Sequence, residues 1–167
     1  MKICHYVHTN EGGGVQNVVA ALIERTDDAQ IEYVICYNRE HRTRNARLED
    51  ADVTLIHLDR KITGVRDLIY CIRELTTIIE REEIDLVHGH IVHQQIVARC
   101  AGKIAGIPVI GTAHSMPGFF SPRLLALERL TRPFEAKTVA VSEGIYHAWR
   151  SMDTHEILER RYRQSAD

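Results

Sequence analysis

The chain has 167 residues, 44% of them hydrophobic, which is enough to fill the core of one domain of ordinary size. Its formal net charge of −2 excludes a surface that attracts nucleic acid or another polyanion through its overall field. The four cysteines are far apart and form no C-x-x-C pair, which argues against zinc or disulfide sites and predicts buried free thiols.

Short apolar runs alternate with helical patterns along the chain, which is typical of repeated βαβ units. The expected strands span residues 3–7, 32–37, 53–58, 85–90, 109–112 and 138–141. The expected helices span residues 15–25, 65–81, 92–105, 123–131 and 143–150. We therefore expect an α/β fold: a single Rossmann-like domain over residues 1–150, in which helices cover both faces of a mostly parallel six-stranded sheet.

The connecting segments carry their own signals. Gly106 is expected to end the helix over 92–105, and Pro108 to open the next strand. Residues 38–52 are charged and predict a solvated loop with a short helix, or else a basic lip that meets an anionic lipid or acceptor. Residues 151–167 are expected to form a separate unit, a charged C-terminal helical tail with a thin apolar stripe.

The location follows from two expected absences. The first residues turn polar within ten positions, so no secretory signal is expected. The apolar stretches fall short of the about 20 residues that cross a bilayer. We expect a cytoplasmic protein, at most peripheral to the inner membrane face. A docking surface of Arg123, Arg129, Arg132 and Lys137 around leucines is one interpretation of the 123–137 region; a solvated arginine face over buried leucines is the other.

A glycine turn at residues 12–14 joins the first strand to the first helix. Gly12, Gly13 and Gly14 would let backbone N–H groups at the helix N-terminus approach an anion closely. This pattern predicts a phosphate or carboxylate site, although glycine in such a turn also serves backbone geometry alone.

Polar residues also end or follow three later strands, and the carboxyl ends of parallel strands meet at one sheet edge. These residues are His88 and His90 in the last part of the fourth strand, His114 and Ser115 after the fifth, and Ser142 and Glu143 after the sixth. In a doubly wound sheet the loops that carry them converge with the glycine turn, which predicts one ligand site.

The histidines admit more than one role. His114 is placed to donate a hydrogen bond to a phosphate or a sugar hydroxyl, or to make a structural hydrogen bond. His88 and His90 have the spacing of two metal ligands, but no third ligand is evident, so we expect no metal and hydrogen bonds to loop backbone instead. Ser115 and Ser142 lie in no G-x-S-x-G elbow, and the glycine turn lacks the dinucleotide fingerprint G-x-G-x-x-G.

Four segments, taken in this order, resemble the amino-terminal half of family 4 glycosyltransferases, enzymes of the GT-B fold. They are residues 8–19 (HTNEGGGVQNVV), 85–90 (DLVHGH), 105–115 (AGIPVIGTAHS) and 138–143 (TVAVSE), and the resemblance covers residues 1 to about 150. It implies the acceptor-side domain of a two-domain enzyme whose other domain holds a nucleotide-sugar donor. It also implies transfer of a hexose with retention of configuration and without a metal ion.

The resemblance assigns roles to individual residues. Gly13 and Gly14 would approach the donor's diphosphate, and His114 would lie beside the transferred sugar as the catalytic residue. Ser142 and Glu143 would line the floor of the cleft. The other expected substrate- and phosphate-binding residues are Gly12, His90 and Ser115. Gln16 and Asn17 depart from the family pattern, in which an acidic and a basic residue are more usual.

The donor-binding domain of the family is missing from these 167 residues. We therefore expect the acceptor-side half of a hexosyltransferase of polysaccharide biosynthesis, inactive as an isolated chain. It would use no cofactor beyond the nucleotide-sugar co-substrate and would act on a saccharide or lipid-linked acceptor. A donor-domain chain, or a second copy joined through the C-terminal tail, is an expected partner. A non-catalytic binding or assembly module that kept the fold is the alternative.

Overall fold

The structure is a computed structural model that describes residues 1–26, 30–40, 45–49, 51, 53–151 and 157–159. Its strands form one sheet in the order β3-β2-β1-β4-β5-β6-β7, and each neighbouring pair is parallel. The strands are β1 (Lys2–Thr9), β2 (Glu32–Arg39), β3 (Thr54–His57), β4 (Leu86–His90), β5 (Val109–Ala113), β6 (Lys137–Ala140) and β7 (Ile157–Glu159). The six expected strands are confirmed, and β7 is an addition.

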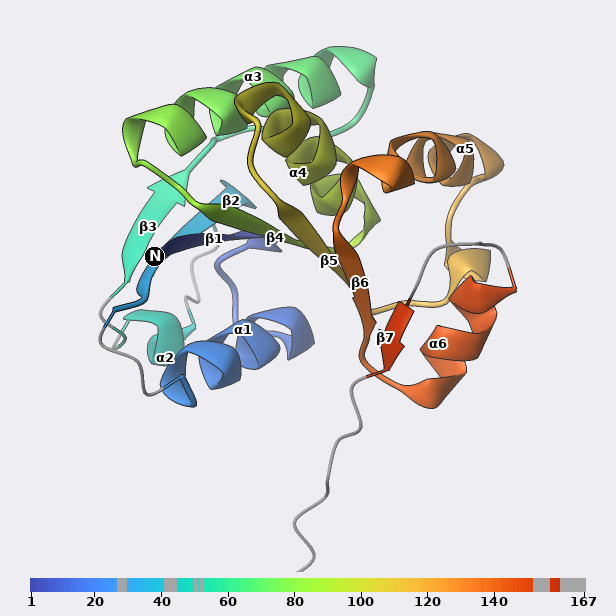
Figure 1. Ribbon diagram of the computed structural model, residues 1–167, viewed down its shortest axis with the longest axis horizontal. Coiled ribbons are helices and arrows are strands. Elements are labelled where there is room, and N and C mark those ends of the chain that lie inside the picture. The colour runs from blue at the N-terminus through green and yellow to red at the C-terminus, as the bar shows by residue number, and fades with distance from the viewer. Residues whose placement is uncertain (27–29, 41–44, 50, 52, 152–156, 160–167) are drawn as a thin grey trace, which may run out of the picture.

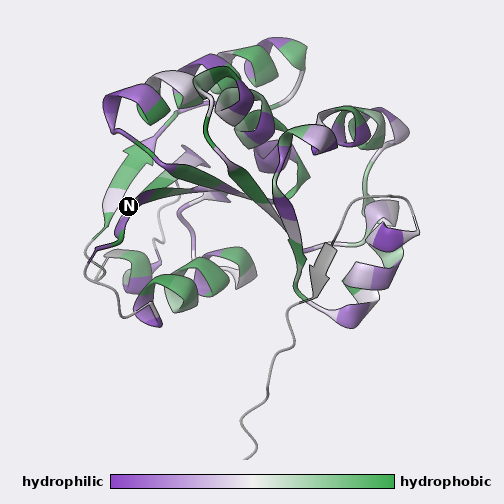
Figure 2. Cartoon of the chain, in the orientation of Figure 1, coloured by the Kyte–Doolittle hydropathy of each residue, from purple (hydrophilic) through white to green (hydrophobic). Residues whose placement is uncertain are grey.

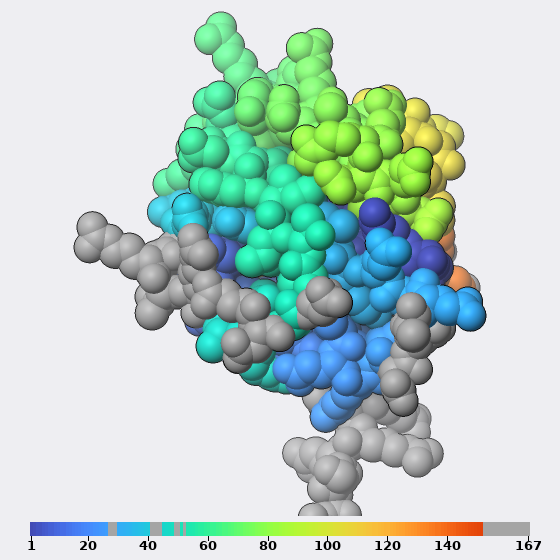
Figure 3. All heavy atoms as spheres, turned by 90° about the vertical axis from the view of Figure 1, so that its left-hand side faces the viewer, coloured from blue at the N-terminus to red at the C-terminus, as the bar shows by residue number. Residues whose placement is uncertain are grey.

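Helices cover both faces of the sheet, as expected (Figure 1). One face carries α1 (Gly14–Glu24) and α2 (Ala46–Glu49), and the other carries α3 (Val65–Arg81), α4 (Val92–Ala105) and α5 (Pro122–Thr131). Helix α6 (Glu143–Arg150) lies beside the β6 end, and two short 3-10 turns, η1 (Pro117–Phe119) and η2 (Arg132–Phe134), flank α5. Figure 3 shows the layers from the β3 edge, with α3 above the strands and α1 below them.

The strands alternate their side chains between two cores. Cys4 and Tyr6 of β1 pack with α3 and α4, whereas Val7 packs with α1. Figure 2 shows the hydrophobic residues concentrated in the central strands, which are buried from both sides. A third cluster joins α4, β5, β6 and α6 around Trp149, which is 2% exposed.

Helix α4 lies unusually close to the sheet. A Cβ on Gly102 would come within 2.3 Å of Val109 on β5, and one on Gly89 would come within 3.0 Å of the Gln95 backbone. The helix ends at Gly106, as expected, with φ of 74° and its N–H bonded to the Gly102 carbonyl. This close packing fixes the α4 N-terminus at the carboxyl end of β4.

A buried ionic network ties α4 to the β6 side of the fold. Arg99 donates to Glu135 at 2.7 Å and to Glu128 at 3.0 Å, and all three side chains are at most 3% exposed. Arg132 also pairs with Glu128 and is buried, so the expectation that Arg132 belongs to a solvated or lipid-facing basic surface is wrong. Burying its guanidinium is compensated by that ion pair.

The C-terminal tail differs from the expected helix. Residues 157–159 form β7, which pairs with β6 from Thr138 to Ala140. Without this partner β6 would be the sheet edge, with unpaired backbone groups that favour strand addition. Residues 152–156 and 160–167 of the expected tail lie outside the described residues, as do Arg42 and Arg44 of the charged loop. Among the described helices, none is long and apolar enough to cross a membrane.

Candidate functional site

The strand order puts a topological switch point between β1 and β4. From these two adjacent strands the sheet grows outward in opposite directions, to β2 and β3 on one side and to β5 and β6 on the other. Loops that leave the carboxyl ends of such strands diverge to opposite faces and leave a crevice, where α/β proteins bind ligands. Because β1, β4, β5 and β6 are parallel, the expected site residues all lie at this one edge of the sheet.

The glycine turn presents open backbone. Gly13 is the N-cap of α1 in extended conformation, and no described side chain caps the helix there. A Cβ on Gly12 or Gly14 would meet no described atom within 4 Å, and none of the three glycines has a positive φ. Among the described residues of the first turn, none is acidic. The helix N-terminus therefore keeps the N–H groups and partial positive charge that suit an anion.

Gln16 closes this turn from inside. Its buried side chain donates through Nε2 to the carbonyl of Thr9 at 2.7 Å, and its Oε1 would lie 2.9 Å from a Cβ on Gly13. Glutamine at the third helical position thus ties the end of β1 to the start of α1. This role explains the residue at a position where the family pattern usually differs.

A chain of three hydrogen-bonded imidazoles runs from the middle of β1, through the end of β4, to the residue after β5. His5 Nδ1 lies 3.1 Å from His90 Nε2, and His90 Nδ1 lies 3.1 Å from His114 Nε2. His88 lies 2.6 Å from the Thr112 hydroxyl. The expectation that His90 bonds to loop backbone is therefore wrong, since both of its ring nitrogens contact histidine side chains. His5 was not expected at the site at all.

Burial keeps these imidazoles neutral. Desolvation lowers the pKa of His5 and of His114 to about 4, and it lowers the pKa of His90 well below its usual value, with a further contribution from the charges of His88, His5 and His114. A neutral imidazole offers one donor and one acceptor. Because His114 engages His90 with Nε2 and is only half-buried, its other ring nitrogen is the one available to a ligand.

The remaining expected residues have structural roles at the same edge. Ser142 is the N-cap of α6 and accepts from the Ile145 N–H at 3.4 Å, and Glu143 lies exposed in the first turn of that helix. The Ser115 carbonyl accepts from the Trp149 indole at 2.9 Å. The two loops are adjacent, since the Val141 N–H donates to the Ala113 carbonyl at 3.3 Å. Ser142 and Ser115 thus hold the two loops in place, and the Glu143 carboxylate is exposed to solvent.

Two cavities lie along the same carboxyl edge, between the start of α3, the start of α4 and the α5 region. Their volumes are about 310 and 240 Å³, and they share Ile62 and His93. The smaller one is lined by His8, Lys61, Ile62, Ile91, His93 and Gln94. None of the site residues expected from the sequence, all of which the structure describes, lines either cavity.

Besides His5, sequence analysis missed His8 and His93, which line the cavities. Burial lowers the pKa of both, and the charges of Arg39, His93 and Lys61 lower the pKa of His8 further. His8 is the penultimate residue of β1, and His93 follows β4 in the first turn of α4, so both lie near the carboxyl ends of strands, the signal that selected the other candidates. Ile91, between His90 and α4, has φ of 68°, a strained value for a β-branched residue at this edge.

Comparison with known proteins gives one family match and several structures of similar fold. The profile of Glycosyltransferase Family 4 matches residues 12–157. No curated protein matches the chain. Solved structures resemble it, among them the apo form of the lipopolysaccharide outer core galactosyltransferase WaaB, with 14% identity and a TM-score of 0.73 over 95% of this chain and 44% of that one.

Two further solved structures carry nucleotide ligands. Anabaena Alr3699/HepE in complex with UDP and glucose is 16% identical, with a TM-score of 0.73 over 96% of this chain and 44% of that one. UDP-GlcNAc 2-epimerase from Neisseria meningitidis bound to UDP-GlcNAc is 20% identical, with a TM-score of 0.67 over 95% and 45%. At these identities the likeness shows the fold alone, and the chain spans less than half of each protein.

Both transferases and epimerases share this fold, so the fold does not choose between them. The family profile does, because it matches most of the chain, including the histidine and glycine segments at the sheet edge. The fold is one Rossmann-like half of the two-domain GT-B architecture. The chain belongs to Glycosyltransferase Family 4.

Proposed function

We propose that this domain is the acceptor-side half of a retaining, metal-independent glycosyltransferase. It would transfer a hexose from a nucleotide-sugar to a saccharide or lipid-linked acceptor, in polysaccharide biosynthesis at the inner face of the cytoplasmic membrane. The observation that carries the proposal is the family match over residues 12–157. A donor-binding domain, in the same protein or in another chain, completes the cleft.

The donor meets the glycine turn in this proposal. Open backbone at Gly12 and Gly14 gives a diphosphate close access to the α1 N-terminus, whose N–H groups stabilise the charge that develops on the leaving group. His114, neutral and supported by His90, donates a hydrogen bond from its free ring nitrogen to the transferred sugar. The nucleotide ligands of two solved neighbours support the choice of a nucleotide-sugar.

The acceptor occupies the cavities beside this crevice. Their lining combines apolar side chains from α3 and α5 with donors from His8, His93 and Lys61. Such a mixture suits a sugar ring, which presents both C–H faces and hydroxyl groups. Exposed Leu127 and Leu130 on α5, next to Arg123 and Arg129, would face the lipid part of a lipid-linked acceptor.

A titration of the ¹⁵N-labelled chain with UDP-glucose tests the donor side. We expect weak, saturable shifts at the amides of Gly12–Gly14 and the ring of His114, and no sugar transfer by the chain alone. Gly14→Ala places a methyl group where the phosphate approaches and should weaken binding about two- to fivefold, the range of a helix-terminus interaction. Gly118→Ala, at an exposed glycine with equally open surroundings, is the matched control.

Two results separate the alternatives. Shifts that avoid the glycine turn, or a Gly14→Ala variant that binds as well as the original chain, would refute the donor site. Binding at the turn without transfer after a donor-domain chain is supplied would favour the binding or assembly module instead.

A further inference from the structure

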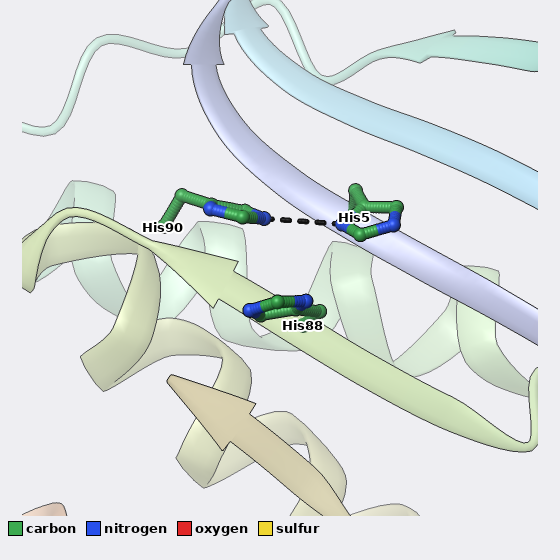
Figure 4. Close-up of side chains that lie close together, drawn as sticks. All are labelled: His5, His88 and His90. Atoms are coloured by element: carbon green, nitrogen blue, oxygen red, sulfur yellow. Dashed lines mark hydrogen bonds between the residues drawn. The ribbon is translucent and has the colours of Figure 1, made fainter. Parts of the chain in front are cut away.

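Three histidines from two neighbouring strands gather on one face of the sheet (Figure 4). His5 of β1 lies directly opposite His88 of β4, and His90 lies two residues further on the same face of β4. His5 is 3% exposed and His90 is fully buried, whereas His88 is half-buried and leaves an approach from solvent. Both strands are in the centre of the sheet, so the three side chains stand on a rigid base.

Their nitrogen atoms lie within reach of a single ion. One nitrogen from each of the three rings lies within 4.8 Å of the other two, and His5 Nδ1 and His90 Nε2 are 3.1 Å apart. A tetrahedral zinc ion with Zn–N bonds of about 2.1 Å holds its ligand nitrogens roughly 3.4 Å apart. Small rotations of the side chains therefore close the set around an ion.

The surroundings of the three rings also suit metal ligation. Histidine ligands usually engage their second nitrogen in a hydrogen bond that fixes the tautomer. His90 has such a bond to His114 at 3.1 Å, and His88 has one to Thr112 at 2.6 Å.

We propose that His5, His88 and His90 form a binding site for a divalent transition-metal ion, with zinc as the preferred occupant. Three imidazoles select ions such as Zn²⁺ over Mg²⁺, which prefers oxygen ligands. The fourth coordination position of the ion would lie on the side of His88, the one half-buried ligand. The ion would not contact the sugar donor or acceptor, so the transfer proposed above stays metal-independent in its chemistry, and ion binding does not rest on that proposal.

Metal binding would affect His114 in the transfer site by fixing which nitrogen of His90 carries the proton. With Nε2 of His90 on the metal, the proton of that ring lies on Nδ1 and is donated to His114 Nε2. His114 then keeps its own proton on Nδ1, the nitrogen proposed to face the sugar. The metal would thus fix a tautomer that is otherwise shared along the imidazole chain.

Calorimetric titration of the chelator-treated chain with Zn²⁺ tests the site. We expect one equivalent of Zn²⁺ per chain, no binding of Mg²⁺, and a rise in Tm with Zn²⁺ as the ion binds only the folded state. His88→Gln removes one ligand but keeps a polar side chain beside Thr112, and it should weaken binding at least tenfold. His147→Gln, at an exposed histidine on α6, should leave binding unchanged.

The Co²⁺ form of the unaltered chain gives a second readout that does not depend on a variant's folding. A visible spectrum of four-coordinate, nitrogen-ligated Co²⁺ supports the site, and a weak octahedral spectrum overturns it. Absence of stoichiometric Zn²⁺ binding, or equal binding by a folded His88→Gln variant, would also overturn the proposal. In that case the three rings are a hydrogen-bonded imidazole cluster only.

Discussion

His5 and His114 carry the clearest residue-level consequence, because burial lowers the pKa of each from 6.5 to about 4. Between these two values the unfolded chain binds protons that the folded chain does not, so folding weakens as the pH falls below about 6.5. A shift of this size costs about 2 kcal/mol for each histidine by pH 5. Urea unfolding should show a free energy of unfolding that is lower at pH 5 than at pH 7 by about 2 kcal/mol for each of these two histidines. His90 lowers it further, because burial lowers its pKa as well.

The His114→Gln variant isolates one of these groups. Glutamine offers a donor and an acceptor to His90 but does not titrate, so the difference between pH 7 and pH 5 should shrink by about 2 kcal/mol. An equal pH response in the His114→Gln variant and the original chain would contradict the assigned cause.

At this scale the sequence predicts where residues lie better than what they touch. His90, His114 and Gly106 could be placed because each lies at or just after the end of a predicted element. The contact between His5 and His90 depends on the register that sets His5 opposite His88, which no local pattern reveals. The cavity roles of His8 and His93 were missed for the same reason, because they depend on loops from α3 and α5.

At the scale of elements, the Arg99 network holds α4, α5 and β6 together. Burial alone would lower the pKa of Arg99, but Glu135 and Glu128 outweigh burial and hold that pKa above its ordinary value. Arg99→Met should therefore cost about 3–5 kcal/mol, because buried Glu135 loses its ion-pair partner and buried Glu128 keeps only Arg132. Arg73→Met, at an exposed position of α3, should change stability by less than about 0.5 kcal/mol.

Urea unfolding of both variants measures this difference, and a double variant of Arg99→Met and Glu135→Gln should recover part of the loss, since Glu128 keeps its ion pair with Arg132. Gly111 belongs to the same arrangement, since a Cβ there would lie 2.5 Å from Glu135 Oε2. A cost below about 1 kcal/mol for Arg99→Met would mean that packing, not the ionic network, holds these elements.

Most helices and strands could be predicted from hydrophobic periodicity. The exceptions, the first turn of α3 and strand β7, depend on contacts with other parts of the fold. The apolar stripe of α3 predicts that Val65 and Ile69 face the core with Leu75 and Ile79, but Val65 is 68% and Ile69 46% exposed. Val65 instead lines the larger cavity at the sheet edge. The sequence pattern predicts a helix over residues 157–159, but these residues form strand β7 by pairing with β6, a contact distant in sequence.

At the scale of the whole molecule, the two ends of the sheet differ in how they are protected. Strand β3 ends one side, and β7 ends the other by pairing with β6. The strand order, with its switch point beside β1 and β4, could be expected from the alternation of strands and helices together with the resemblance. The position of the last strand could not, because edge pairing leaves little trace in a short sequence.

Two shortened chains test what β7 contributes. A chain ended at Ser151 leaves the backbone of β6 unpaired, and an open parallel edge is a template for pairing with another molecule. A chain ended at Glu159 keeps β7 and serves as the matched control. Sedimentation velocity should show the 1–151 chain self-associating at concentrations where the 1–159 chain behaves like the full 167 residues. If both shortened chains sediment alike, β7 does not protect the β6 edge, and α6 beside it is the element that must do so.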